Sequence, residues 1–416
     1  MSEPGWAAAA LAALLVALVV VGVSGWPRGV PAVPRAAQLH ALRSLPPDAV
    51  ASGRAYHRAV RPIGYAAALL ALAVLLALAT TPAGRWLVDL LAAPWGGHWL
   101  AAVALAGPAV VLAAEVATLP LAALRHRISV RHGLSHQPWR AWWGDRLKAY
   151  AVTVVTTALA LAGLWTLIRL WPAWWWAPAA VGAAALVVLL SFVLPMVVEP
   201  LFLRFAPMPA GELRDRLTDL ARRAGTPVRQ VLVADASRRS RAVNAYVSGL
   251  GPSRRVVVFD TLLSAPPSEV SAVVAHELAH ARYRDVAAGT ARTALVAAAA
   301  VTGLYLLGRW PPVLRLAGVE TLADPRAVPL VVALAAVAGV VLAPAQAAWS
   351  RRVEARADAF GLALTGDPDG QAAMFARLAA TNLADPDPPR WERLLASHPP
   401  VVERIAAARA TGRERR

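Results

Sequence analysis

Two histidines four residues apart, His276 and His280, frame Glu277 in the pattern HExxH. Side chains at positions i and i+4 lie on one face of a helix, so both imidazoles can reach a single metal ion. The carboxylate of Glu277 can then take a proton from a water that the metal activates. Proline and serine residues at 266–268 favour a helix start shortly before the motif. The alternative interpretation is a pair of surface histidines on an ordinary helix.

The third protein ligand has to come from elsewhere in the chain. A catalytic zinc needs three protein ligands and an open position for water, and this chain has no cysteine. Glu354 follows the last long apolar run, on the same predicted side as HExxH. Asp358 lies one helical turn further on and can accept the second ring N–H of a ligand histidine. We expect one zinc ion per chain, held by His276, His280 and Glu354. The alternative is that both carboxylates are solvated and paired with neighbouring Arg side chains.

Two more side chains have types and positions that could serve function. His398 precedes two prolines, which restrict it to an extended or turn backbone, and we expect it to be buried with a fixed ring direction. From there it could donate a hydrogen bond to the oxyanion of a tetrahedral intermediate. The alternative is a loop histidine without a role. Glu115 lies in an apolar run, where a carboxylate is either functional or part of a buried ion pair.

Long apolar runs dominate the chain. Hydrophobic residues make up 58% of its 416 residues, against roughly 45–50% apolar residues in soluble proteins. A helix needs roughly 20 apolar residues to cross a bilayer. Seven runs reach or approach that length, at 6–25, 63–81, 98–120, 149–170, 174–198, 287–308 and 328–348. We interpret the first run as a retained span rather than a cleaved signal.

The distribution of positive charge predicts how these spans are oriented. The formal net charge is +17, and the segments after the first and third runs are rich in Arg, whereas those after the second and fourth hold very few. Cytoplasmic loops carry such an excess, so the N-terminus should face out and HExxH the cytoplasm. Arg residues flanking apolar runs, without a recognisable nucleic-acid module, favour a membrane over a nucleic-acid partner.

These patterns predict a mainly α, polytopic membrane protein of about seven transmembrane helices with a small α/β cytoplasmic zinc-protease domain. The largest polar loop predicts a helix over 212–224, strands over 228–233 and 255–259, and between them a strand and turn over 244–251. Four parts follow: five spans in 1–198, the α/β segment with HExxH in 199–286, two spans in 287–348, and a tail completing the zinc site in 349–416.

The chain resembles the type I CAAX prenyl endopeptidases, which are integral membrane zinc metallopeptidases with seven spans. Four stretches carry the resemblance: Arg131 to Gln137, Asn244-Ala-Tyr246 with Gly249, Val274 to His280, and Glu354 to Phe360 together with His398 to Arg404. Val130 departs from the acidic residue that often precedes the first stretch in the family. The role of the loop at 125–148 therefore stays open.

The resemblance implies a ring of helices around a large water-filled chamber, with zinc at its cytoplasmic end. It also implies that Asn244 lies on a strand that pairs with the substrate backbone. By the same likeness His398 assists at the transition state, and Arg404 supports the substrate or the site. The partners implied are the lipid bilayer and a peptide or protein substrate, either lipidated or not.

Three functions compete at this point. The first is a membrane endopeptidase for membrane-associated or prenylated proteins. The second is an HtpX-like quality-control protease, which shares HExxH and the downstream Glu but has about four spans. The third is a metalloprotease-like signal transducer, which would need an extracytoplasmic sensor domain. The Ala- and Arg-rich composition favours a bacterial source, hence the plasma membrane. Substrate and oligomeric state are not predicted.

Overall fold

Helices long and apolar enough to cross a membrane form most of the molecule. The computed structural model describes residues 2–27, 32–193, 196–197, 199–249 and 253–414. Seven helices found within these residues meet the length and composition of a span: α1 (Glu3–Ser24), α3 (Pro47–Thr80), α5 (Trp99–Arg131), α6 (Trp139–Leu170), α7 (Trp176–Val193), α11 (Asp285–Leu307) and α13 (Val328–Thr365). Their number and composition are those of a multi-pass membrane protein, as the apolar runs predict.

The outer surfaces of these helices are apolar. Large aliphatic side chains are exposed along α1, α6, α7 and α13, among them Val19, Leu159, Val181 and Val341. Soluble proteins rarely expose contiguous apolar patches of this extent, because water solvates them poorly. A bilayer accounts for this surface.

Several of the spanning helices are longer than their apolar runs. The run at 63–81 belongs to α3, which has 34 residues, and the run at 328–348 belongs to α13, which has 38. The hydropathy signal stops where charged residues begin, although the backbone hydrogen bonding continues. The predicted boundary between 348 and 349 therefore falls inside one continuous helix.

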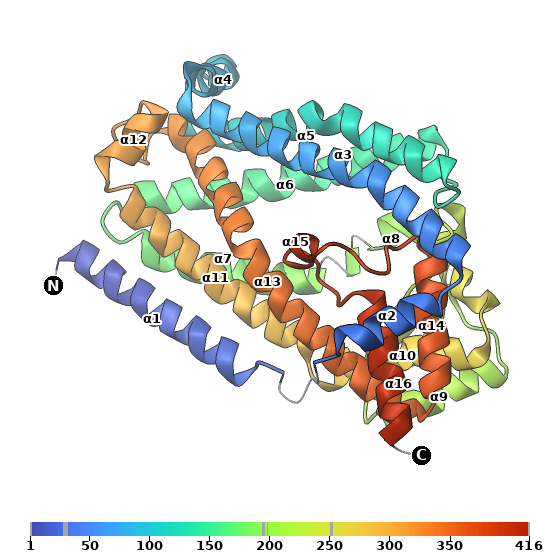
Figure 1. Ribbon diagram of the computed structural model, residues 1–416. Coiled ribbons are helices and arrows are strands. Elements are labelled where there is room, and N and C mark those ends of the chain that lie inside the picture. The colour runs from blue at the N-terminus through green and yellow to red at the C-terminus, as the bar shows by residue number, and fades with distance from the viewer. Residues whose placement is uncertain (1, 28–31, 194–195, 198, 250–252, 415–416) are drawn as a thin grey trace.

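One end of the molecule, here called the far end, collects the N-terminus and the segments after spans two, four and six (Figure 1). It includes α4 (Pro82–Ala92), η1 (Ala93–Trp95), α12 (Pro311–Ala317) and η6 (Pro325–Ala327). Glu3 pairs with Arg309 at 3.3 Å, and Asp89 pairs with Arg326 at 2.8 Å. These contacts join segments that the charge pattern assigns to a common side.

The opposite end, here called the site end, collects the odd-numbered loops and the C-terminal segment. It includes α2 (Arg35–Arg43), α8 (Glu199–Phe202), α14 (Pro368–Thr381) and α16 (Val401–Glu414), while α15 (Arg390–Arg393) lies further in, between the membrane helices (Figure 1). Arg35 pairs with Asp387 at 2.7 Å, and Arg61 pairs with Asp385 at 2.8 Å. The partition of loops into two ends agrees with the charge pattern, and the cytoplasmic assignment of the site end stays a prediction.

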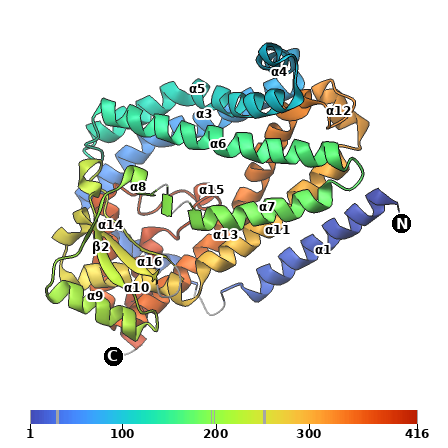
Figure 2. The same ribbon diagram turned by 180° about the vertical axis from the view of Figure 1, so that it is seen from behind.

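A four-stranded mixed sheet lies at the site end (Figure 2). Its order is β1-β2-β4-β3, formed by Phe205–Pro207, Gln230–Ala234, Arg255–Phe259 and Ala245–Ser248. Strands β2 and β4 are parallel, with Val231 opposite Val256, and the outer strands are antiparallel to their neighbours. The sequence predicts three of these strands, but it misses β1, which has three residues and ends in proline. Part of the predicted turn at 244–251, residues 250–251, lies outside the described residues.

The core of the site end packs helices against this sheet. It joins α9 (Glu212–Arg223) and α10 (Pro267–Arg282) to α14, α16 and one face of the sheet, with η3 (Ala236–Arg238) and η5 (Asp260–Ser264) as short connections. The largest side chains that are almost fully buried there are Leu217, Leu262, Leu278, Phe375 and Ile405. Because α10 lies inside this core, the residues it carries are held rigidly.

Candidate metal centre

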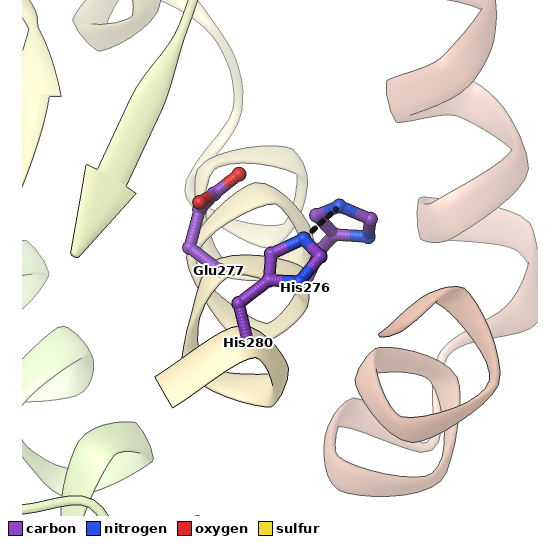
Figure 3. Close-up of side chains that lie close together, drawn as sticks. All are labelled: His276, Glu277 and His280. Atoms are coloured by element: carbon purple, nitrogen blue, oxygen red, sulfur yellow. Dashed lines mark hydrogen bonds between the residues drawn. The ribbon is translucent and has the colours of Figure 1, made fainter. Parts of the chain in front are cut away.

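The HExxH motif lies in the C-terminal half of α10. This helix begins at Pro267, where the missing N–H of proline is tolerated. The Nε2 atoms of His276 and His280 lie 3.2 Å apart, and a ligand atom from each of His276, Glu277 and His280 falls within 4.8 Å of the others (Figure 3). The i to i+4 spacing therefore brings both rings to one point, as the sequence predicts.

Glu354 reaches the same point from α13. Its Oε2 lies 3.2 Å from His276 Nε2, and its Oε1 lies 3.5 Å from His280 Nε2. Close helix packing makes this possible. Gly361 on α13 lies against α10, where an added Cβ would stand 3.2 Å from the backbone nitrogen of His276.

These donors fit a divalent metal ion. Glu354 is buried, and its Oε2 accepts no hydrogen bond from the described residues. A buried carboxylate oxygen without a donor is unfavourable, and two histidine nitrogens and one carboxylate oxygen form a donor set that zinc uses in catalytic sites. The side chains of His276, His280 and Glu354 would hold the ion.

Asp358 and Arg404 lie behind the first histidine. The Nδ1 atom of His276 lies 2.8 Å from Asp358 Oδ1, at hydrogen-bonding distance. Arg404 donates from Nε to Oδ2 of Asp358 at 2.7 Å and from Nη2 to Oδ1 at 2.6 Å. With Nδ1 of His276 held by Asp358, Nε2 is free to bind a metal. Accepting the second ring N–H of a ligand histidine is the role that the sequence suggests for Asp358. Arg404, which the resemblance associates with the substrate or the site, contacts the site through Asp358.

A second carboxylate, Asp285, lies behind His280, and the sequence analysis misses it. Its Oδ2 lies 3.0 Å from His280 Nδ1, and its Oδ1 accepts a hydrogen bond from Arg356. Asp285 begins α11, after Arg284 turns the chain with a left-handed backbone (φ 55°). The spacing of five residues does not place Asp285 beside His280 on a continuous helix. In the sequence, the only signal for this contact is that a carboxylate follows the second histidine at a short distance.

The environment of Glu277 suits a proton acceptor. Burial raises the pKa of this carboxyl group, and the two histidines oppose the shift. A base works best when its pKa lies near the operating pH. For His276, burial disfavours the charged ring, but the adjacent carboxylates of Asp358 and Glu354 outweigh it and raise the pKa to about 10 in the metal-free protein.

His398 stands at the site, but it is not buried. Its Nε2 lies 3.3 Å from Glu354 Oε2, and 58% of its side chain is exposed. The expectation of burial is therefore wrong. The two prolines after it are buried, and they hold the backbone while the ring projects outwards. Ser397 Oγ lies 2.8 Å from its Nδ1.

Asn244 and Glu115 lie outside the group of metal-binding side chains. Asn244 precedes β3, and its exposed side chain accepts a hydrogen bond from the backbone N–H of Ala245. Glu115 on α5 lies 3.9 Å from Arg146 on α6 and is 45% exposed. The sequence analysis gives Glu115 either a function or a place in a buried ion pair. The structure shows a pair with an Arg, but the pair is not buried.

Known proteins share this sequence and fold. Residues 207–412 match Peptidase family M48, and residues 33–204 match the CAAX prenyl protease N-terminal region of five membrane helices. The uncharacterized metalloprotease YhfN of Bacillus subtilis is 30% identical over 304 residues, covering 71% of each chain. The CAAX prenyl protease 1 homolog of Arabidopsis thaliana is 28% identical over 289 residues, covering 67% of this chain and 66% of the relative.

The fold also resembles a solved structure. The crystal structure of S. mikatae Ste24p matches with a TM-score of 0.68 and 23% identity, over 74% of this chain and 76% of that one. At this identity the match concerns the fold alone. The family to which the chain belongs follows from the two matched regions and from the bacterial relative. The chain belongs to peptidase family M48, as a multi-pass membrane metalloprotease with a CAAX prenyl protease N-terminal membrane region.

Proposed function

We propose that this chain is a zinc metalloendopeptidase of a bacterial plasma membrane, with its active site facing the cytoplasm. Its substrates are membrane-associated proteins or peptides, including prenylated proteins of the CAAX type. The observation that supports this best is the convergence of His276, His280 and Glu354, from two helices, beside the half-buried carboxylate of Glu277.

Each residue of the site has a distinct task. One zinc ion per chain would polarise the scissile carbonyl and make a water more acidic. Glu277 takes the proton of the attacking water and passes it to the leaving amine. Asp358 and Asp285 keep the Nδ1–H tautomer of the two histidines, so that each Nε2 presents its lone pair. Arg404 neutralises Asp358 and fixes its direction.

His398 is assigned to the transition state. Its exposed ring lies on the open side of Glu354, where a substrate carbonyl can approach it. An N–H donated to the developing oxyanion stabilises the tetrahedral intermediate. The three protein ligands of a catalytic zinc are already supplied, which leaves His398 free for this task.

Strand β3 supports a mode of substrate binding. It is an edge strand, because β4 pairs with one side of it and no other described strand pairs with its second side. It packs beside α10 in the same core, through Ala245. An extended peptide can add to such an edge by backbone hydrogen bonds. Asn244, immediately before β3, is then placed to contact the substrate.

The proposed substrate class is based on the similarity to CAAX prenyl proteases. The membrane architecture argues against the two alternative functions, an HtpX-like protease and a signal transducer. CAAX prenyl protease 1 homologs are among the relatives, whereas the bacterial relative is named only as a metalloprotease. Seven membrane-length helices among the described residues do not fit an HtpX-like protease with about four spans. A signal transducer is also disfavoured, because the far-end segments are short and form only α4, η1, α12 and η6 among described elements.

The test compares purified full-length protein on three substrates: a farnesylated CAAX peptide, the same peptide without the farnesyl group, and casein. We expect zinc-dependent cleavage of the farnesylated peptide at a higher kcat/KM than of its unmodified form. Equal cleavage of all three would refute the CAAX assignment and leave a general membrane protease. No cleavage by zinc-loaded protein would refute the peptidase proposal itself.

Glu277→Gln tests the chemistry within that assay. It removes the base but keeps the size of the side chain, so zinc content should stay near one per chain while turnover falls by about 10²–10⁴-fold. Glu269→Gln is the matched control, since Glu269 lies on the same helix and pairs with Arg377 away from the site. The control should keep near-normal turnover. Activity in Glu277→Gln equal to that of the control would sink the mechanism.

A further inference from the structure

A basic cavity opens at the site end, apart from the metal centre. It has a volume of about 250 Å³, and Lys148, Arg204, Arg238 and Arg239 line it together with residues 200–203. We propose that this basic cavity binds the phosphate of an anionic phospholipid headgroup. The volume is many times the roughly 10–15 Å³ that a single water requires, so a phosphate with its glycerol ester fits.

The charge of the basic cavity favours an anion. Asp145 pairs with Arg239 at 2.9 Å and with Lys148 at 3.6 Å. Asp235 pairs with Arg238 at 2.6 Å, and no ion pair is formed by Arg204 with the described residues. Four cations against two carboxylates leave two positive charges. That excess matches a phosphate group better than a neutral ligand.

Arg239, which lines the basic cavity, has one buried donor without an acceptor. Asp145 accepts from Arg239 Nε at 2.9 Å and from Nη2 at 3.1 Å, which orients the guanidinium group. The remaining nitrogen, Nη1, is buried and has no hydrogen-bond partner among the described residues. A buried unpaired donor is unfavourable, and phosphate oxygens are strong acceptors for guanidinium. A phosphate in the cavity would supply the missing acceptor if the guanidinium group turned Nη1 toward it, since Nη1 is now covered by protein atoms.

The basic cavity lies at the level where lipid headgroups are found. Lys148 immediately precedes the apolar run at 149–170, and α8 follows the end of α7. Trp139 and Trp143, on the same end of α6, are exposed, as tryptophans of a membrane interface are. Lys148 lies five residues beyond Trp143, about 7.5 Å along the helix axis. Basic pockets at this depth on the cytoplasmic side suit phospholipid headgroups.

Apolar side chains beside the basic cavity distinguish a phospholipid from free phosphate. Leu201 lines the cavity and is exposed, and Leu147, next to Lys148 in the chain, is also exposed. Met196 and Val197, shortly before α8, are exposed as well. A phospholipid uses both features, because its phosphate contacts the cations while its acyl chains cover the apolar surface.

The experiment titrates phosphatidylglycerol into the purified full-length protein at about 0.15 M salt and counts bound lipids by native mass spectrometry. The variant is Arg204→Gln with Arg238→Gln. The matched control is Arg214→Gln with Arg216→Gln on α9, which removes the same charge. Arg216 and Arg238 are 45% and 46% exposed, and each pairs with an acid in its own segment.

We expect the first phosphatidylglycerol to bind about 25-fold more weakly to the variant, at roughly fivefold per basic residue removed near a membrane surface. The control should bind as the native protein does. Lys148→Gln, a single change, should weaken binding roughly fivefold, and it replaces the double variant if that one fails to fold. Binding to the cavity variant within twofold of the control would overturn the proposal.

Three competitors separate the sources of the anion. Phosphatidylcholine has the same phosphate but no net charge, and it should compete weakly. Inorganic phosphate should not displace the lipid at equal concentration, because it lacks the acyl chains. Displacement by inorganic phosphate would assign the basic cavity to free phosphate, and displacement by a polyglutamate peptide would assign it to an acidic protein segment. Either result would overturn the lipid assignment.

Discussion

Replacing Asp285 by Asn should impair metal binding while leaving the fold intact. In the native protein the two oxygens of Asp285 face different partners, His280 Nδ1 and Arg356. Asn has one oxygen and one NH2 group, and Arg356 can only donate. The amide oxygen will therefore turn to Arg356 and the NH2 group to His280. The ring must then accept at Nδ1 and carry its proton on Nε2, where the metal should bind.

The expected loss follows from this wrong tautomer. Changes to the partner behind a ligand histidine typically reduce metal affinity or activity by about 10- to 100-fold, which corresponds to about 1.4–2.7 kcal/mol. Zinc affinity can be measured by competition with a chromogenic chelator. Because only the tautomer equilibrium is disturbed, saturating zinc should restore most of the peptidase activity.

A matched control separates this effect from loss of an ion pair. Asp387 pairs with Arg35 and Arg393 and is 10% exposed, against 12% for Asp285, but no histidine among the described residues pairs with it. Asp387→Asn should lower thermal stability by a similar amount and leave zinc affinity unchanged. If Asp285→Asn binds zinc as tightly as the native protein, or if both variants lose affinity equally, the tautomer argument is wrong.

Four further predictions follow from the same structure. His398→Ala should keep full zinc content and slow turnover by about 10²–10³-fold with little change in KM; loss of zinc would make it a ligand instead. Gly361→Ala should shift α10 against α13 by a few tenths of an ångström, because its Cβ would lie 3.2 Å from the backbone nitrogen of His276, and so weaken zinc binding measurably in the chelator assay. Because His276 has a pKa of about 10 without metal, zinc must displace its proton, and affinity should rise by about tenfold per pH unit from pH 6 to 9; a flat profile would contradict this. Cysteine introduced at Arg140 should be labelled from the cytoplasm and cysteine at Asp89 from outside, and the reverse pattern would invert the topology.

The sequence predicts the elements that have a strong local signal. Seven apolar runs give the seven spans, and prolines at 266–267 give the start of α10. The extents of the long helices are less predictable. Helix α3 continues for sixteen residues before the run at 63–81, through a segment that contains Arg61. Hydropathy measures preference for lipid, whereas these extensions are stabilised by ion pairs such as that of Arg61 with Asp385.

The sequence predicts the carboxylate partner of one histidine but not that of the other. Asp358 is found because it lies four residues from Glu354, so helical periodicity connects the two. Asp285 is hidden because the helix breaks between it and His280, at Arg284, which has a left-handed backbone. Glycine is the residue that usually signals such a break. An Arg in this conformation costs about 1–3 kcal/mol and persists only where surrounding contacts impose it, which no local pattern reveals.

The metal centre depends on the packing of two helices, because the HExxH motif alone does not supply all of its residues. Helix α10 carries two of the proposed ligands and the proposed base, whereas α13 carries Glu354 and Asp358, so the proposed ligand set is complete only where the two helices touch. Gly361 sets that contact, seven residues from Glu354 and therefore about two helical turns along α13. Because α13 also crosses the membrane, any displacement of its span relative to α10 moves Glu354 away from the histidines. The membrane helices thus determine the geometry of the site directly, which gives a physical reason for a protease of this kind to be built into a bilayer.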